Sequence, residues 1–173
     1  MAINNKKSLP AGRQGFALLV AVIFMSVVLT LGLALGSLGY KQQILASGAI
    51  ASQYAFYAAD AGMECALYAD QQLDYFNYAS HSTNNPPNVI TCDTVAATQL
   101  SYSYDASRLY VSERLSLDAG KHCADVTVYK FSSPQAPSGA VTYIFSQGYD
   151  VSCNTVATPA GARFVARGVN IHY

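Results

Sequence analysis

The stretch RQGFALLVAVIF, Arg13–Phe24, changes abruptly from a basic, polar leader to an apolar segment at the junction of Gly15 and Phe16. No residue from Phe16 to Tyr40 is charged, and the next charge is Lys41. This run of 25 residues is long enough to cross a hydrocarbon core of ~30 Å as a helix. The sequence therefore predicts a leader over residues 1–15 and a transmembrane helix over residues 16–40.

The charges around this segment predict its orientation. Lys6, Lys7 and Arg13 precede it with no acid among them, which places the N-terminus in the cytoplasm by the positive-inside rule. The chain after Lys41 is then expected outside the cytoplasmic membrane. Only 12% of residues are charged and the net charge is zero, so no electrostatic footprint for nucleic acid is present. Without the leader, seven Lys or Arg residues stand against ten Asp or Glu, a net charge of −3.

Two other interpretations of the apolar run remain open. A cleaved secretory signal peptide has an apolar core of about 7–15 residues and a small-x-small cleavage site. The segment LALGSLG, Leu33–Gly39, imitates such a site, but the run before it is too long. An uncleaved signal anchor is the stronger alternative.

The apolar helix is expected to continue beyond the membrane. No proline interrupts the chain from Phe16 to Asp70, so one helix of about 55 residues and ~80 Å fits the rise of ~1.5 Å per residue. Residues 41–70 form an amphipathic continuation in which apolar residues recur at steps of three and four. These residues are Tyr54, Tyr57, Ala61, Cys65 and Tyr68.

Glycines interrupt the apolar segment. Gly32 and Gly36 have the small-xxx-small spacing that lets membrane helices approach closely. Glycine also weakens a helix by up to about 1 kcal/mol relative to alanine. We expect a role in helix packing or in local flexibility, and the sequence does not separate the two.

After Asp70 the periodicity changes to that of β-structure. Residues 74–88 are polar and aromatic, contain Pro86-Pro87, and predict a long surface connection. Period-2 patterns then predict strands. They cover residues 100–104, 123–130, 141–149 and 163–173. Short, turn-rich connections favour an antiparallel meander, so residues 71–173 are expected to form a β-rich head. The predicted fold class is α+β, with the long helix packed on an antiparallel sheet.

Two segments together resemble a known family. A polar leader that ends in Gly15, followed by Phe16 and a long apolar helix, resembles the class III signal of type IV pilins and type II secretion pseudopilins. The stretch Tyr57-Ala58-Ala59-Asp60-Ala61 resembles the distal helix of PilX-type minor pilins. The resemblance covers about the first 70 residues and implies a pilin-like fold.

The resemblance also implies processing, partners and location. A membrane prepilin peptidase would cleave between Gly15 and Phe16 and methylate the new N-terminus at Phe16. The retained helix would contact membrane lipid before assembly and other pilin subunits in the filament core, which an assembly platform builds. The chain would be a single-pass protein of the inner membrane and then part of an extracellular pilus.

One position departs from the usual pilin pattern. The fifth mature residue is normally glutamate in this family, and here it is Val20. PilX- and GspK-type minor subunits show the same departure, which implies a minor subunit that initiates assembly or occupies the filament tip. The alternatives are a major pilin, a membrane-anchored surface or adhesin domain that does not assemble, and a subunit of a DNA-uptake filament.

Four cysteines, Cys65, Cys92, Cys123 and Cys153, lie in the exported part of the chain. Two disulfides are expected there, with three possible connectivities. Cys123 and Cys153 flank a predicted hairpin and can meet, which would leave Cys65 for Cys92. Because no pair has CxxC spacing, no metal site is expected.

Catalytic patterns are absent from the sequence. His81, His122 and His172 fall in a predicted loop, turn and strand, and no nucleophile elbow, phosphate-binding loop or HExxH motif occurs. The acids Asp118, Asp125 and Asp150 match no EF-hand loop. We expect a structural protein without a cofactor, not an enzyme.

Overall fold

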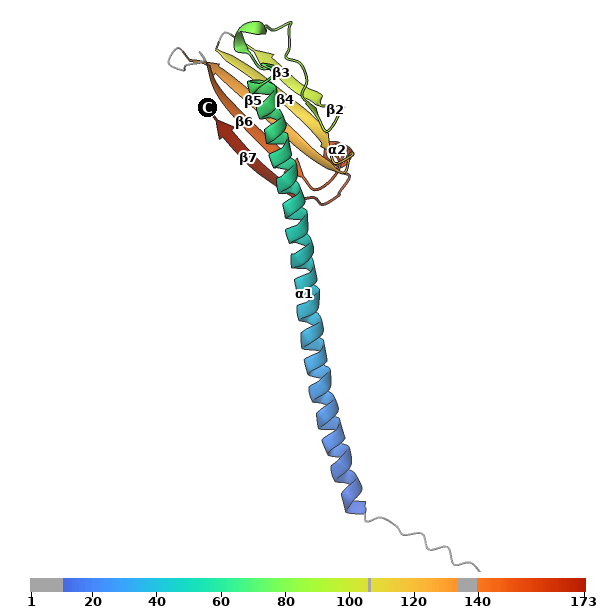
Figure 1. The fold of residues 1–173 in the computed structure, drawn as a ribbon. Coiled ribbons are helices and arrows are strands. Elements are labelled where there is room, and N and C mark those ends of the chain that lie inside the picture. The colour runs from blue at the N-terminus through green and yellow to red at the C-terminus, as the bar shows by residue number, and fades with distance from the viewer. Residues whose placement is uncertain (1–10, 106, 134–139) are drawn as a thin grey trace, which may run out of the picture. The chain divides into compact units, whose positions relative to one another are not determined.

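The computed structural model describes residues 11–105, 107–133 and 140–173, with side chains from Gly15 onward. These residues fall into two compact units, one that ends at Ala46 and one that runs from Ser47 to Tyr173. The helix α1, Ala11–Gln71, contributes to both units. Figure 1 shows the order of the elements along the chain.

The long helix α1 confirms the expected uninterrupted helix but begins earlier than predicted. The predicted start was Phe16, whereas α1 begins at Ala11. The first ten residues of the predicted leader lie outside the described part of the chain.

The second unit contains a five-stranded antiparallel sheet in the order β3-β4-β5-β6-β7. Its strands are β3 (Thr98–Tyr104), β4 (Arg108–Leu117), β5 (His122–Ser132), β6 (Ala140–Tyr149) and β7 (Ala166–His172). A two-stranded ribbon of β1 (Thr91–Cys92) and β2 (Val95–Ala96), a 3-10 turn η1 (Tyr78–Ser80) and a short helix α2 (Cys153–Ala157) complete the unit. This arrangement confirms the predicted α+β, pilin-like layout of a long helix on an antiparallel meander.

Strand β4 was not among the predicted strands. Glu113 stands in its centre at a position where the alternation of Leu109, Val111, Leu115 and Leu117 calls for an apolar residue, and Arg114 adds a second charge beside it. Both charges have partners in the fold: Glu113 accepts a hydrogen bond from the Ile90 N–H, and Arg114 pairs with Asp125. These partners lie elsewhere in the chain, so the local sequence pattern does not reveal that the two charges are tolerated in a strand.

Two predicted connections also contain structure that the sequence pattern missed. The turn-rich link after Cys153 begins with α2, capped at Ser152, whose hydroxyl accepts from the Thr155 N–H. The connection over residues 74–88 is largely exposed, yet Phe76 within it is fully buried. The expected turn between residues 116 and 122 lies between β4 and β5, with Gly120 at a positive φ of 89°.

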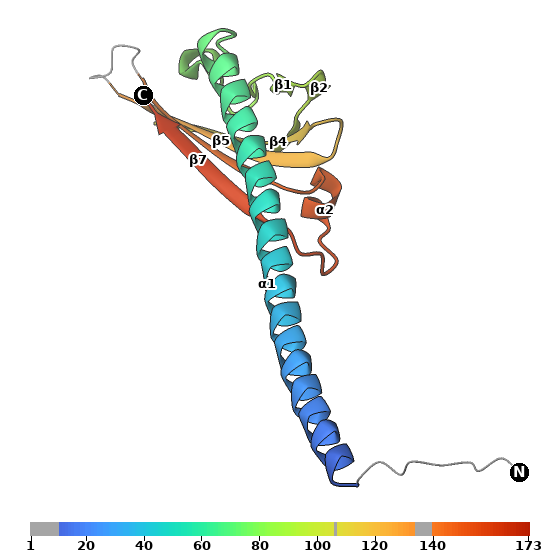
Figure 2. The same cartoon turned by 60° about the horizontal axis from the view of Figure 1, so that its bottom comes forward.

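The second half of α1 lies across one face of the sheet (Figure 2). The contacts are made by small residues, because Ala55, Ala59 and Ala66 are completely buried. A Cβ added at Gly148 of β6 would stand 2.2 Å from the Ala55 carbonyl oxygen, so only glycine permits this approach of helix to strand.

The packed face of α1 coincides only in part with the apolar face that the sequence traced. Of that face, Ala61 and Cys65 pack against the core, whereas Tyr54, Tyr57 and Tyr68 are 50%, 63% and 59% exposed. The large tyrosine rings made this face look apolar in the sequence. Close packing of a helix against a sheet, however, requires small side chains. The buried row instead consists of alanines, with Gly62 and Met63.

Candidate functional site

The predicted processing junction lies near the start of α1. Gly15 and Phe16 are both helical, and the Phe16 side chain is 72% exposed. A Cβ added at Gly15 would meet no atom within 4 Å beyond the adjacent helix backbone. Within the described part of the chain, the junction is therefore open to an external partner.

Val20, the position where the resembled family carries glutamate, lies in an apolar surface. It borders a shallow hollow of about 240 Å³ together with Ile23, Phe24 and Val27, at the helical spacing i, i+3, i+4 and i+7. Val20 is 48% exposed and no acid lies among these residues. A carboxylate at this position would have no cationic partner within the hollow.

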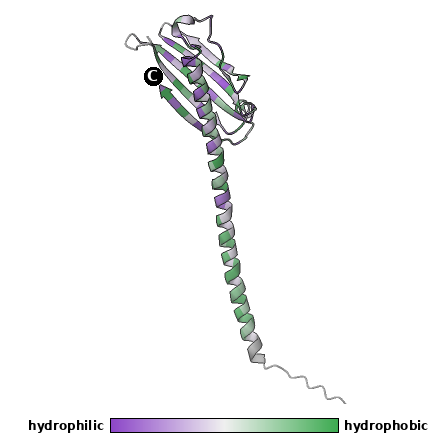
Figure 3. Ribbon diagram, in the orientation of Figure 1, coloured by the Kyte–Doolittle hydropathy of each residue, from purple (hydrophilic) through white to green (hydrophobic). Residues whose placement is uncertain are grey.

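The first half of α1 is long and apolar enough to cross a membrane, and Figure 3 shows its hydrophobic colouring on the segment before Lys41. Three of its hydroxyl side chains form hydrogen bonds to backbone carbonyls of the same helix. Ser26, Thr30 and Ser37 each donate to the carbonyl three residues earlier, at 2.7, 2.9 and 2.9 Å. These bonds lower the cost of placing hydroxyls in a medium without water.

Gly32 and Gly36 occupy the same open helix. A Cβ added at either position would meet no described atom within 4 Å, apart from the adjacent helix backbone. The predicted packing role therefore requires a partner that is not part of this described chain. The five predicted residues of this unit are strung along one helix and do not form a cluster.

The four cysteines form two disulfides in the second unit. Cys65 of α1 joins Cys92 of β1, with Cα atoms 6.0 Å apart, and Cys123 of β5 joins Cys153 of α2, with Cα atoms 4.8 Å apart. These are the pairs that the hairpin argument favoured among the three connectivities. The described chain has no free cysteine.

A buried carboxyl fastens the connection after α1 to the sheet. Glu113 is 1% exposed, and its Oε2 accepts from the Ile90 N–H at 2.8 Å. Its Oε1 has no hydrogen-bond partner among the described residues. Burial raises the pKa of Glu113 above its usual value, and the hydrogen bond from Ile90 offsets this only in part.

A second polar cluster joins the end of α1 to the C-terminus. Asp70 Oδ1 lies 2.6 Å from Lys130 Nζ, and Asp70 Oδ2 accepts a hydrogen bond from the Tyr173 hydroxyl at 2.6 Å. Burial and the bond to Asp70 raise the pKa of Tyr173 far above its usual range. The Tyr173 backbone also exchanges two hydrogen bonds with Thr142, at 2.8 and 3.1 Å. No local pattern predicts this cluster, because its members are far apart along the chain.

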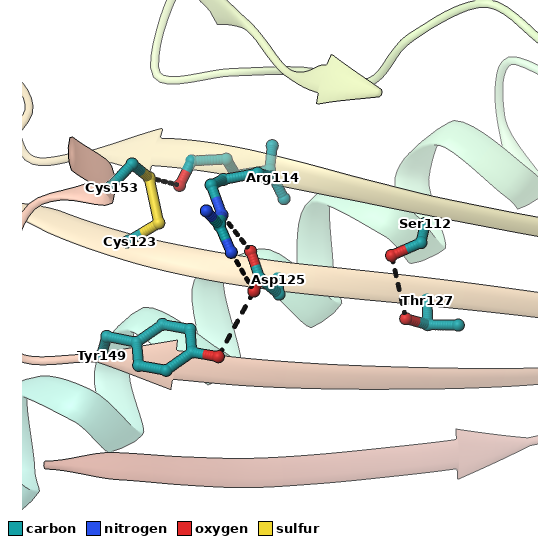
Figure 4. A network of polar contacts seen from close by, with 8 residues as sticks. Ser112, Arg114, Cys123, Asp125, Thr127, Tyr149 and Cys153 are labelled. Carbon is teal, nitrogen blue, oxygen red and sulfur yellow. Dashed lines mark hydrogen bonds and ion pairs between the residues drawn. A yellow bond between two sulfur atoms is a disulfide. The ribbon is translucent and has the colours of Figure 1, made fainter. Parts of the chain in front are cut away.

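The opposite face of the sheet carries a bidentate ion pair (Figure 4). Arg114 donates from Nε and Nη2 to Asp125 at 2.6 and 2.7 Å, and the Tyr149 hydroxyl donates to the same carboxylate at 3.3 Å. The bond to Asp125 raises the pKa of the Arg114 guanidinium. This pair ties β4 to β5, and the nearby Cys123–Cys153 disulfide ties α2 to β5.

The remaining titratable side chains do not converge. His122 stacks on Tyr54 with 5.0 Å between ring centroids, His172 stacks on Tyr143, and His81 Nε2 lies 2.7 Å from the Tyr75 carbonyl oxygen. Asp118 faces Lys121 at 3.5 Å, and Asp150 accepts from the Val165 N–H at 2.7 Å. No group of three His, Cys, Asp or Glu side chains suited to a metal occurs among the described residues.

Comparison with known proteins found no matching family model, no matching curated protein and no matching solved structure. Function must therefore be argued from the chain itself.

Proposed function

We propose that this chain is a minor pilin-like subunit of a type IV pilus or pseudopilus, which helps initiate assembly or sits at the filament tip. The observation that carries the proposal is α1, one continuous helix over Ala11–Gln71. It is exposed and uncharged from Phe16 to Tyr40, and its second half packs on an antiparallel sheet. An ordinary anchor needs only about 20 residues of helix. A helix that continues into the core of the head is what a subunit needs if its anchor later becomes part of a filament.

The absence of a charged residue at the fifth mature position, Val20, argues for a minor subunit. A lone carboxylate in an apolar helix costs about 2.5–3.5 kcal/mol on insertion scales. In the resembled family it is tolerated because it pairs with the N-terminal ammonium of a neighbouring subunit. A subunit that enters first has no such neighbour, and an apolar residue such as Val20 suits that place better.

Processing provides the first test. In cells with a prepilin peptidase, intact-mass measurement is expected to find a chain that starts at Phe16 and carries one added methyl group. A Gly15→Leu variant should remain uncleaved, whereas the matched variant Gly39→Leu, within the helix, should mature normally. A mature chain that starts near Tyr40 would indicate a secretory signal peptide, and an uncleaved native chain would indicate a signal anchor.

Subunit counting provides the second test. In sheared filaments the chain should be far scarcer than the major pilin, and deletion of its gene should reduce the number of filaments. Val20→Glu should give no gain in incorporation. If the chain were the dominant subunit along the shaft, it would be a major pilin and the tip proposal would be wrong.

A further inference from the structure

The face of the sheet that points away from α1 carries a continuous series of aromatic rings. Cross-strand register places Tyr110, Tyr129 and Tyr143 side by side on β4, β5 and β6. The Tyr110 and Tyr129 ring centroids are 4.9 Å apart. Tyr143 in turn stacks on His172 of β7, at 5.6 Å and an interplanar angle of 18°. The ring series therefore crosses four strands.

Two phenylalanines complete a hollow on this face. Phe131 lies beside Tyr129 in a parallel orientation, and Phe145 meets Tyr129 edge to face. Phe131, Tyr143 and Phe145 are 39%, 36% and 43% exposed. Together with Tyr129 they line an open hollow of about 920 Å³, here called the aromatic hollow. This volume lies within the range of small-ligand sites, about 300–1,000 Å³.

Hydroxyl groups flank the rings. Thr127 precedes them along β5, Ser132 and Ser133 follow them, and the remaining described residue of the aromatic hollow is Val141. Thr127 already donates to Ser112 Oγ at 3.4 Å. A purely apolar occupant would remove the two serine hydroxyls from water without giving them partners, which is costly. The occupant that fits presents C–H surfaces to the rings and hydroxyl groups to the serines and threonine.

The charged residues near the aromatic hollow are paired, which argues against an ionic partner. None of the described residues that line the hollow is charged. Arg108, the cross-strand neighbour of Phe131 on this face, pairs with Asp105 at 3.6 Å. Arg114 and Asp125 neutralise each other at 2.6 Å, and Lys130 is held by Asp70 at the other face. Single-stranded nucleic acid binds aromatic platforms that also have a cationic groove, which this hollow lacks.

The size of the hollow argues against a second copy of the chain. Eight of the described residues line it, whereas a stable protein interface takes about 20–30 residues from each partner. We propose that the aromatic hollow binds an uncharged oligosaccharide, whose sugar rings stack on Tyr129, Phe131 and Tyr143 while their hydroxyls bond to the polar rim. The inference goes beyond the proposed assembly function and does not rest on it.

Binding is tested on the full chain in lipid nanodiscs. An array of uncharged and sialylated glycans is screened first, and the best uncharged glycan is titrated by calorimetry. Tyr143→Ala is expected to weaken binding about tenfold, the loss of one well-packed ring. Tyr143→Phe, which keeps the ring, should bind within about twofold of the native chain. The control Tyr68→Ala removes an exposed tyrosine ring from α1, away from the hollow, and should bind as the native chain does.

Several outcomes would overturn the inference. They are the absence of saturable binding to any uncharged glycan, equal binding by Tyr143→Ala and Tyr68→Ala, and preferential binding of sialylated glycans or of an oligothymidylate. Concentration-dependent pairing of the chain that Tyr143→Ala abolishes would assign the hollow to a second copy. Intact disulfides and an unchanged near-ultraviolet circular dichroism spectrum establish that each variant is folded, and Phe131→Ala replaces Tyr143→Ala if the latter is not. Because the assay needs neither cleavage nor filaments, its failure is distinct from failure of the assembly proposal.

Discussion

The two halves of α1 use glycine in opposite ways. Gly62, in the second half, faces β5 and β6 so closely that an added Cβ would stand 2.7 Å from Ser146 Oγ and 3.0 Å from Ala124 Cβ. Gly32 and Gly36, in the first half, face no described atom within 4 Å outside the adjacent helix backbone. Glycine therefore allows close packing within the chain in the second half of α1, whereas in the first half it leaves an open helix surface.

This difference indicates where each half finds its partners. The second half has its partner in its own sheet, where Ala55, Ala59 and Gly148 allow the helix backbone to lie against a strand. The first half is apolar on all sides and exposed, so lipid or other helices must cover it. Variants that change one half should therefore leave the other unaffected.

The largest effect is expected at Gly148. Gly148→Ala places a methyl group 2.2 Å from the Ala55 carbonyl oxygen and the Ala59 nitrogen, and neither backbone atom can move without displacing α1. We expect a loss of at least about 3 kcal/mol, or roughly 10 °C in Tm. The measurement is thermal unfolding of the nanodisc-embedded chain, followed by tyrosine circular dichroism.

A glycine on the neighbouring strand supplies the control. A Cβ at Gly168 of β7 would meet its nearest atom, the Ser146 carbonyl oxygen, at 3.7 Å, which is ordinary contact. Gly168→Ala should therefore change Tm by no more than a few degrees. Equal losses in the two variants would show that strand propensity, and not close packing of α1, sets the cost.

The next effect is expected at the disulfide between α1 and the ribbon. Cys65 and Cys92 close a loop with a sequence separation of 27, which corresponds to about 3 kcal/mol in the loop-entropy account. The double variant Cys65→Ser/Cys92→Ser should lose about that much stability in chemical denaturation, without any change in membrane insertion. A variant as stable as the native chain would show that packing of Phe76 and Ile90 alone holds this connection.

The sequence predicted the features that depend on local pattern. Uninterrupted apolar residues predicted α1, alternation predicted most of β5 and β6, and the hairpin between Cys123 and Cys153 favoured their pairing. Strand β4 was missed because Glu113 and Arg114 obtain their partners from segments distant in the chain. The packed face of α1 was predicted only in part for the same reason: Ala61 and Cys65 pack as traced, but the requirement for Ala55 and Ala59 arises from the close approach of Gly148.

A smaller effect is expected from pH. Burial raises the pKa of Glu113 above its usual 4.5, so the folded state binds this proton more tightly than the unfolded state. The contribution of this bound proton to the stability of the fold is fully present below pH 4.5. It is lost as the pH rises through the raised pKa of Glu113 in the folded state. Stability should therefore increase as the pH falls from 7 toward 4.5, and Glu113→Gln should flatten that slope. Parallel pH profiles for the two chains would contradict this assignment.

The smallest effect on the head is expected from the open half of α1. Gly32→Leu/Gly36→Leu adds bulk where no described atom lies within 4 Å beyond the helix itself, so the free energy of unfolding of the head should change by less than about 0.5 kcal/mol. The same variant should reduce lateral helix association, because small-xxx-small spacing is what allows close approach in a membrane. Photo-cross-linking from Val20 in native membranes measures that association, with Leu33→Ile as the matched control. A fall in Tm like that of Gly148→Ala would mean that the first half of α1 packs within its own chain, and the contrast between the two halves would not hold.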